Sequence, residues 1–205
     1  MKVLFVISPD IIPKKKFIKP KKKVGLYIPL SIAQISAVLE EQGHDIKVLD
    51  LRLSNNIFHD LFNSIKNSTP DLVGFTDSFF SAKITQDLTK ELRKKFKGLI
   101  VLGGSYATVF AKNILKINKA IDIIVLDEAD AMTMEAQSAL RKVMESYSKI
   151  TRFCFICNYI NQIISPITSR CVKFRFKPLN VPSMFCKLQD ISVKESVNIT
   201  DKALK

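Results

Sequence analysis

The fold is decided by a short apolar stretch near the middle of the chain, Ile121-Asp122-Ile123-Ile124-Val125-Leu126-Asp127-Glu128. Its four central residues are all apolar, which is typical of a buried strand in a parallel sheet. Asp127 and Glu128 follow at the carboxyl end of this strand, and open α/β sheets bind their ligands beyond that end. The stretch therefore predicts a parallel α/β sheet with acidic residues at its ligand-binding edge.

Similar apolar runs recur on both sides of this stretch and alternate with helical patterns. This alternation predicts a doubly wound α/β fold, in which helices cover both faces of a parallel sheet. The expected strands are residues 2–7, 45–50, 71–76, 99–102, 121–127, 151–158 and 172–176. The expected helices are residues 29–42, 56–66, 81–96, 106–116 and 133–147, with a short helical tail after Pro178.

Composition favours a globular protein without a membrane span. Of the 205 residues, 47% are hydrophobic, which is enough for a sizeable core. Charges interrupt every apolar run well before the roughly 18–20 residues that a span needs, and the first residues lack a secretory pattern. The expected location is therefore the cytoplasm or the nucleus. Cys154 and Cys157 lie in an expected strand, which favours reduced core thiols over a zinc or redox pair.

Positive charge is concentrated in the first part of the chain. The net charge is +13, of which +10 falls in residues 1–121 and +3 in residues 122–205. Seven lysines crowd residues 14–23: Lys14, Lys15, Lys16, Lys19, Lys21, Lys22 and Lys23. Such a segment repels itself and is expected to be a solvated loop. It is also the expected site of weak contact with polyanions or nucleic acid, without sequence preference.

Polar residues and glycines gather where the expected strands of the first half end. These residues are Ser8, Asp10, Thr76, Asp77, Ser78, Gly103 and Gly104. Together with the sequences Pro29-Leu30-Ser31, Gly43-His44-Asp45 and Leu102-Gly103-Gly104-Ser105-Tyr106, they resemble the cobalamin-binding domain that precedes the catalytic barrel in many radical S-adenosylmethionine enzymes. The resemblance covers about residues 1–121 and implies cobalamin as cofactor, held by the seven residues named above.

Two features qualify the cobalamin resemblance. Gly103 and Gly104 either admit a ligand close to the backbone or merely form a tight strand-to-helix turn. The D-x-H-x-x-G loop of the family's other branch, whose histidine ligates cobalt, is absent. Any cobalamin is therefore expected to bind without a protein histidine. No C-x-x-x-C-x-x-C cluster motif occurs either, which excludes radical chemistry for this polypeptide alone.

The second half continues from Asp127-Glu128-Ala129-Asp130 into Ala136-Gln137-Ser138-Ala139-Leu140-Arg141, Ile156-Cys157-Asn158 and Ser169-Arg170-Cys171. Residues 122–205 closely resemble the small subunits of replication factor C, the AAA+ sliding-clamp loader. The resemblance implies that Asp127 holds Mg²⁺ and that Glu128 is the catalytic base of a Walker B motif. It further implies that Asn158 is the sensor and Arg170 the finger that reaches a neighbouring subunit's nucleotide.

The part of the chain that resembles the clamp loader lacks that family's phosphate-binding loop. No G-x-x-x-x-G-K-[ST] loop occurs, so Mg²⁺ and ATP are not expected to bind and no hydrolysis is expected. Three hypotheses about the function follow. The protein is a chimera with at most residual ligand binding and no enzymatic turnover, a corrinoid-binding module, or a clamp-loader-like protein that assembles with loader subunits. The chimera could be engineered, naturally recombined or a fused gene model.

The two resemblances together predict one sheet. They imply the flavodoxin-like strand order 2-1-3-4-5-6, with strand 121–127 shared by both halves. We expect a cobalamin-binding half at 1–121, a clamp-loader half at 122–177 and a truncated lid-like tail at 178–205. Strand 172–176 is expected to pair with strand 151–158 as a seventh strand, because an empty slot would leave buried backbone groups unpaired.

Overall fold

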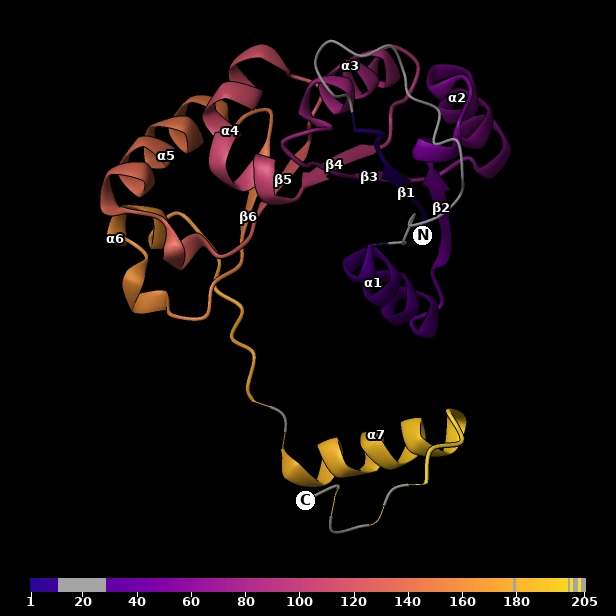
Figure 1. The fold of residues 1–205 in the computed structure, drawn as a ribbon. Coiled ribbons are helices and arrows are strands. Elements are labelled where there is room, and N and C mark those ends of the chain that lie inside the picture. Colours follow the sequence, from indigo (N-terminus) through magenta and orange to yellow (C-terminus); the bar gives the residue numbers. More distant parts are fainter. Residues whose placement is uncertain (11–28, 179, 199, 201–202, 204–205) are drawn as a thin grey trace. The chain divides into compact units, whose positions relative to one another are not determined.

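The computed structural model describes residues 1–10, 29–178, 180–198, 200 and 203. Its centre is one six-stranded, fully parallel sheet with the order β2-β1-β3-β4-β5-β6 (Figure 1). The strands are β1 Lys2–Ile7, β2 Asp45–Asp50, β3 Leu72–Thr76, β4 Leu99–Gly103, β5 Ile123–Leu126 and β6 Arg152–Phe155. The predicted α/β class and the predicted order of the first six strands are confirmed.

Helices α1 to α5 connect the strands, and α6 and α7 follow β6. They are α1 Leu30–Glu41, α2 Ile57–Ser68, α3 Ala82–Arg93, α4 Ser105–Ile117, α5 Met134–Tyr147, α6 Ser165–Thr168 and α7 Val181–Lys194, with short 3-10 turns at Leu51–Leu53, Ala129–Ala131 and Ile160–Gln162. Right-handed crossovers require α1 to lie on the face opposite to α2 and α3, and Figure 1 shows this arrangement. Thr133 caps α5, since its hydroxyl accepts a hydrogen bond from the Ala136 N–H.

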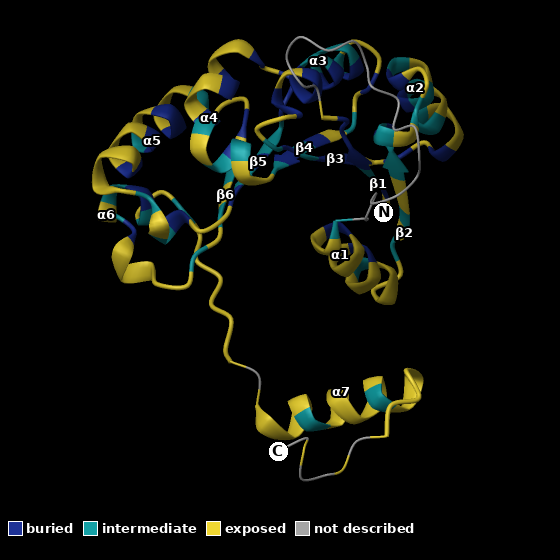
Figure 2. Cartoon of the chain, in the orientation of Figure 1, coloured by how far each residue is buried: buried dark blue, intermediate teal, exposed yellow. Residues whose placement is uncertain are grey.

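The core fills the space between the sheet and helices α2 to α5. Side chains alternate between the two faces of a strand, so one set of strand residues faces these helices. This set includes Leu4, Val73, Ile100, Leu102, Ile124 and Leu126, all buried. The opposite face is more open, because Leu99 on β4 and Ile156 just after β6 are both more than 40% exposed. Figure 2 shows burial concentrated along the strands and the inner sides of the helices.

The strand expected at 172–176 does not exist, and this prediction is wrong. Residues 172–178 have no regular structure, and the side chains of Val172, Phe174 and Phe176 are each more than 80% exposed. The prediction assumed that the outer edge of β6 is buried. Arg152 and Cys154 on β6 are exposed, so water can pair with the backbone groups of this edge strand at little cost.

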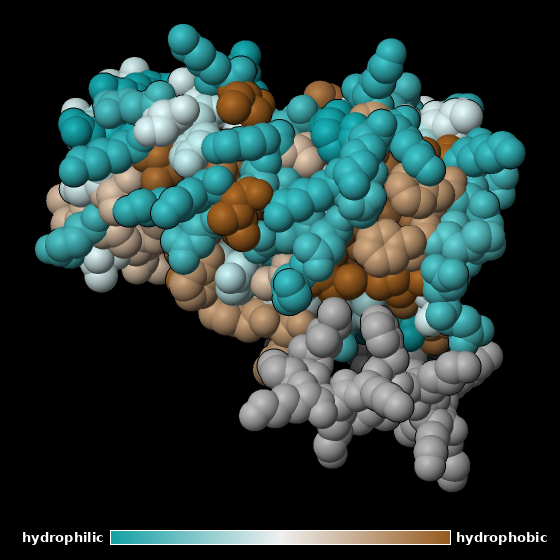
Figure 3. All heavy atoms as spheres, turned by 90° about the horizontal axis from the view of Figure 1, so that it is seen from above, coloured by the Kyte–Doolittle hydropathy of each residue, from teal (hydrophilic) through white to brown (hydrophobic). Residues whose placement is uncertain are grey.

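The chain divides into two compact units, Met1–Ser169 and Arg170–Lys205. The first contains the whole sheet, and the second contains α7, which confirms the helix expected after Pro178. No helix among the described residues is long and apolar enough to cross a membrane. Figure 3 shows a largely hydrophilic face with only separate apolar patches. The lysine-rich segment 14–23 lies outside the described residues.

The four cysteines are free thiols. Cys154 is exposed, so the prediction of a buried core thiol is wrong at this position. The reason is that β6 is an edge strand whose second face carries no helix among the described residues. Cys157 lies beyond the end of β6 and is half-buried, and burial raises the pKa of its thiol.

Candidate functional site

The residues expected to form the ligand site lie at one edge of the sheet. Because all six strands are parallel, their carboxyl ends meet at the same edge. From β1 to β6 this edge carries the following residues: Ser8 and Asp10, then Thr76, Asp77 and Ser78, then Gly103 and Gly104, then Asp127 and Glu128, and finally Asn158. The strand order therefore brings both groups of predicted residues into one row.

Loop 77–81 is held together by hydroxyl groups at the end of β3. The backbone N–H of Ser78 donates to Ser81 Oγ at 2.9 Å, and Ser81 Oγ donates to Asp77 Oδ1 at 3.3 Å. Ser78 Oγ reaches across to β1 and donates to Asp10 Oδ1 at 3.3 Å. Ser81 was missed by the sequence analysis, and its position just before helix α3 was the available signal.

Two buried oxygen atoms at this edge have no hydrogen-bond partner among the residues that the structure describes. They are Ser8 Oγ and Asp77 Oδ2, on side chains that are 4% and 2% exposed. Burial raises the pKa of the Asp77 carboxyl to about 6, against the opposing effect of the hydrogen bond from Ser81. An unpaired buried polar group costs free energy, so a hydrogen-bonding ligand or water at this edge would relieve both atoms.

Only glycine fits at position 104, because the backbone of Asp77 lies against it. Gly104 has φ +108°, and a Cβ at this position would lie 2.3 Å from the backbone oxygen of Asp77. A Cβ on Gly103, by contrast, would make an ordinary contact with Val125 at 3.5 Å. The backbone N–H of Asp77 also donates to the Gly103 oxygen at 2.8 Å. The tight turn therefore explains Gly104 without a ligand.

Three aromatic rings flank the same edge. Phe79 contacts Tyr106 and Phe110 edge-on, with ring centroids 5.5 and 5.8 Å apart, and Tyr106 stacks on Phe110 at 4.7 Å. Phe79 is 56% exposed, so the cluster opens to solvent. The sequence analysis quoted Tyr106 only within a longer stretch and did not predict this cluster, because Phe79 becomes the neighbour of Tyr106 and Phe110 only when β3 and β4 pair.

The acidic residues after β5 are partly engaged by their own loop. The Asp127 N–H donates to Thr108 Oγ1 on α4 at 3.1 Å, and Asp127 Oδ1 accepts the Glu128 N–H at 2.8 Å. The backbone of Glu128 adopts the left-handed conformation, with φ 50°. Both side chains are exposed, and the described residues contain no group of three or more His, Cys, Asp or Glu that could hold a metal ion.

Asp130 connects the loops that follow β5 and β6. Its Oδ2 accepts the backbone N–H groups of Asn158 and Tyr159 at 3.1 and 3.0 Å. These bonds, the Tyr159 bond first, hold the pKa of Asp130 below its usual value. Asn158 is thereby fixed close to the end of β5, with its side chain exposed. Arg170 is exposed and is the first residue of the second compact unit.

Two family models match overlapping parts of the chain. The model described as B12 binding domain matches residues 22–137, more than half of the chain. The model described as DNA polymerase III, delta subunit, matches residues 109–180. The overlap, residues 109–137, contains β5 and the acidic residues after it. Residues 121–128, which the sequence analysis assigned to both halves, thus lie within the overlap of the two family models.

The curated relatives are replication factor C subunits. Subunit 2 of Schizosaccharomyces pombe is 37% identical over 186 residues, covering 86% of this chain and 53% of its own length. Subunit 2 of Saccharomyces cerevisiae is 35% identical over 197 residues, covering 89% of this chain and 54% of its own. Subunit 4 of Homo sapiens is 57% identical over 82 residues, covering 40% and 23%.

The chain spans about half the length, or less, of these relatives. Its identity to them is higher in the short alignment than in the two long ones, which indicates that the similarity is concentrated in one part of the chain. By the extent of the first family match and by its edge of parallel strands, the chain belongs to the B12 binding domain family, joined in one sheet to a part similar to replication factor C subunits.

Proposed function

We propose that this chain is a chimeric α/β protein without ATP turnover, whose remaining activity is to bind a corrinoid at the carboxyl edge of β1, β3 and β4. The observation that carries the proposal is the pair of unpartnered buried oxygens, Ser8 Oγ and Asp77 Oδ2, at this edge. The family match supports the nature of the ligand. We assign this role to residues 1–121, and the clamp-loader-like parts to residues 122–177 and 178–205.

The side chains at this edge fit the polar periphery of a corrinoid. Its amide side chains and nucleotide tail offer both donors and acceptors, and the Ser8 hydroxyl can serve as either. Asp77 can accept when ionised and donate when protonated, which its pKa of about 6 allows near neutral pH. Asp10, Thr76, Ser78 and Gly103 complete the proposed binding residues. We propose that no histidine of this chain ligates the cobalt. His44 precedes β2 at the other edge, and the ring of His59 on α2 contacts Asp60 and Asn63.

We propose the absence of ATP turnover because the phosphate-binding loop is missing from the sequence. Asp127, Glu128 and Asn158 supply the metal and water side of a nucleotide site. A loop of glycine-spaced amides with a lysine is needed to hold the phosphates, and the sequence has none.

Equilibrium dialysis with hydroxocobalamin, whose bound fraction is measured by its visible absorption, tests the corrinoid. We expect saturable binding by the unmodified chain and at least about tenfold weaker binding by the Ser8→Ala/Asp77→Ala variant. The control is Asp45→Asn, an exposed carboxyl at the opposite edge of the sheet. No binding, or equal binding by all three proteins, would contradict the proposal.

Calorimetry with Mg²⁺ and a non-hydrolysable ATP analogue tests the absence of a nucleotide site. We expect weak or no heat of binding. A dissociation constant in the low micromolar range or tighter, on the order of 8 kcal/mol, would contradict this part of the proposal.

A second candidate function is assembly with clamp-loader subunits, favoured by the 57% identity to human replication factor C subunit 4. In this reading Arg170 contributes its planar charge to the nucleotide of an intact neighbouring subunit. Co-purification with replication factor C subunits, lost on Arg170→Ala, would support it. Elution as separate species at micromolar concentrations would contradict it.

A further inference from the structure

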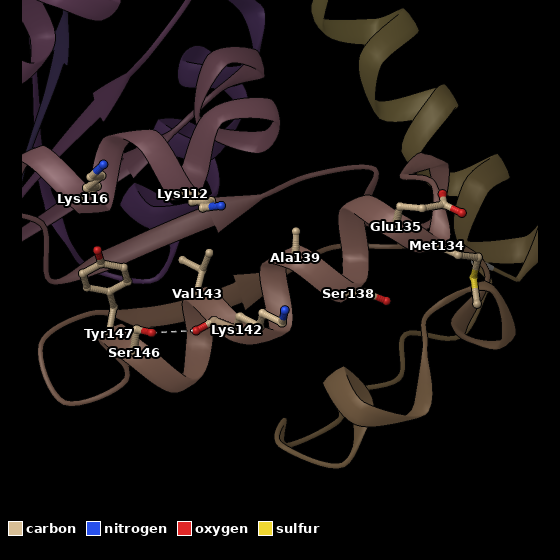
Figure 4. A pocket seen from close by; sticks show the side chains of 10 residues that line it. All are labelled: Lys112, Lys116, Met134, Glu135, Ser138, Ala139, Lys142, Val143, Ser146 and Tyr147. Carbon is tan, nitrogen blue, oxygen red and sulfur yellow. Dashed lines mark hydrogen bonds between the residues drawn. The ribbon is translucent and has the colours of Figure 1, made fainter.

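A groove runs between α4 and α5, on the outside of the sheet (Figure 4). Its volume is about 620 Å³, within the range of binding sites in proteins. The lining residues are Lys112 and Lys116 on α4 and Met134, Glu135, Ser138, Ala139, Lys142, Val143, Ser146 and Tyr147 on α5. None of them belongs to the row of residues at the carboxyl edge, so the groove is a separate feature.

The groove is elongated and has an apolar floor. Its α5 residues recur at three- and four-residue spacing from Glu135 to Ser146, which is one stripe of the helix about 16 Å long. Ala139 and Val143 lie within this stripe, and Met134 and Tyr147 at its ends add further apolar surface. A groove of this shape between two helices matches the dimensions of a third helix laid along them.

The rim of the groove is positively charged. Lys112 and Lys116 stand on α4 and Lys142 on α5 (Figure 4), against a single acid, Glu135. In the part of the chain that the structure describes, none of these three ammonium groups forms an ion pair. Their charges are therefore available to carboxylates of a partner.

We propose that the groove between α4 and α5 is a docking site for an acidic amphipathic helix of a partner protein. Apolar side chains of that helix pack on the exposed Ala139 and Met134, above the buried Val143. Its flanking glutamates or aspartates face Lys112, Lys116 and Lys142. The charge of the rim and the apolar character of the floor call for both properties in one ligand, which an acidic amphipathic helix combines.

Other anions fit the groove less well. Small phosphates are held best where backbone N–H groups point at them. Most residues that line this groove lie beyond the first turn of α4 or α5, where N–H groups are used within the helix, and Glu135 in the first turn of α5 repels anions. A nucleobase needs an open aromatic face. The ring of Tyr147 is covered by Lys119, whose Nζ lies 3.8 Å from the ring centroid.

The groove draws on both halves of the sequence. Helix α4 belongs to residues 1–121 and α5 to residues 122–205, and the two pack side by side only because β4 and β5 are neighbours in one sheet. A partner recognised here is therefore recognised by the joined protein, independently of the ligand proposed at the carboxyl edge.

Fluorescence anisotropy with a designed peptide tests the proposal. The probe is a capped helical peptide of about 16 residues, with leucines at helical spacing on one face and glutamates beside them. Two further probes keep the design but replace the glutamates with lysines or the leucines with serines. We expect saturable binding of the first probe and at least about tenfold weaker binding of both others.

Variants of the chain locate the binding. The triple variant Lys112→Glu/Lys116→Glu/Lys142→Glu should weaken binding of the acidic probe about tenfold or more. A control variant, Lys47→Glu/Lys66→Glu/Lys97→Glu, has the same net charge and should bind within about twofold of the unmodified chain. Circular dichroism melting of each variant verifies the fold, and Ala139→Glu, which places an acid on the floor, provides a second disruption.

Several outcomes would overturn the proposal. Equal weakening by the groove and control triple variants would assign binding to overall charge. Equal affinity for the serine-substituted probe would remove the apolar floor from the site. Competition by tripolyphosphate or single-stranded DNA at lower concentrations than the unlabelled acidic peptide would assign the groove to phosphates instead.

Discussion

Arg93 and Asp122 form an ion pair across the boundary between the two halves of the sequence. The guanidinium of Arg93, at the end of α3, also donates to the backbone oxygens of Phe96, Gly98 and Ala120. Asp122, just before β5, accepts the Ile100 N–H at 2.7 Å. These contacts join the loops that enter β4 and β5, and so hold the second half in register with the first.

Removing the Asp122 carboxylate should destabilise the fold. Asp122→Ala leaves the Ile100 N–H without its acceptor and removes the carboxylate that pairs with Arg93, which should lower the free energy of unfolding by about 1–3 kcal/mol. The matched control is Glu91→Ala, which removes an exposed pair with Lys94 and should cost less than about 0.5 kcal/mol. Urea denaturation measures both. Equal effects would mean that the junction does not depend on Asp122.

The Asp77 carboxyl should make stability depend on pH. Its pKa is about 6 in the folded chain, whereas an unperturbed aspartate carboxyl has a pKa of 3.8. Between these values the folded state binds more protons than the unfolded state, so stability falls as pH rises from about 4 to about 6 and is then constant. The loss is about 3 kcal/mol at most. Denaturant midpoints of the unmodified chain and of Asp77→Asn are measured across this pH range, and their difference isolates the effect of the Asp77 carboxyl. If the two proteins gave parallel curves of midpoint against pH, this prediction would be contradicted.

Gly104 and Gly43 should respond differently to alanine. Both have positive φ, +108° and +80°, so each substitution carries backbone strain of about 1–3 kcal/mol. At Gly104 the new Cβ also meets the Asp77 backbone, whereas nothing lies within 4 Å at Gly43. Gly104→Ala should therefore be at least about 1 kcal/mol more destabilising in a thermal or urea melt. The reverse order would show that loop 77–81 moves away freely.

The lysine-rich segment 14–23 should control adhesion to polyanions. Replacing Lys14, Lys15, Lys16, Lys21, Lys22 and Lys23 with serine should abolish retention on heparin, because that retention follows the number of phosphate-like contacts and falls with salt. Replacing the same six with arginine keeps the charge and should keep the retention. If the serine variant elutes at the same salt concentration as the unmodified chain, the adhesion lies elsewhere.

Most of the fold could be predicted because apolar runs and their order along the chain determine which strands form. The run around Ile124 became β5, although β5 and β6 are shorter than expected. Strand ends depend on hydrogen bonds to neighbours, which the pattern of one strand does not show. The segment at Val172 alternates apolar and basic residues like a strand, yet it has no regular structure, because water can pair with the outer edge of β6 instead.

The candidate site could be predicted only as a row of residues. Parallel strands necessarily bring Ser8 and Asp77 to the same edge, and this followed from the order of elements. That both carry an unpaired buried oxygen could not, because burial depends on how loop 77–81 packs against Gly104. The roles proposed for Asp127, Glu128, Asn158 and Arg170 remain predictions that need the nucleotide and subunit experiments.

The location of the Arg93–Asp122 pair bears on how freely the candidate site can vary. The pair and the bond from Ile100 to Asp122 lie at the amino ends of β4 and β5, whereas the loops of the candidate site leave from the carboxyl ends. Substitutions in those loops therefore leave these contacts in place. The position of β5 in the sheet and the ligand preference of the opposite edge can change independently of each other.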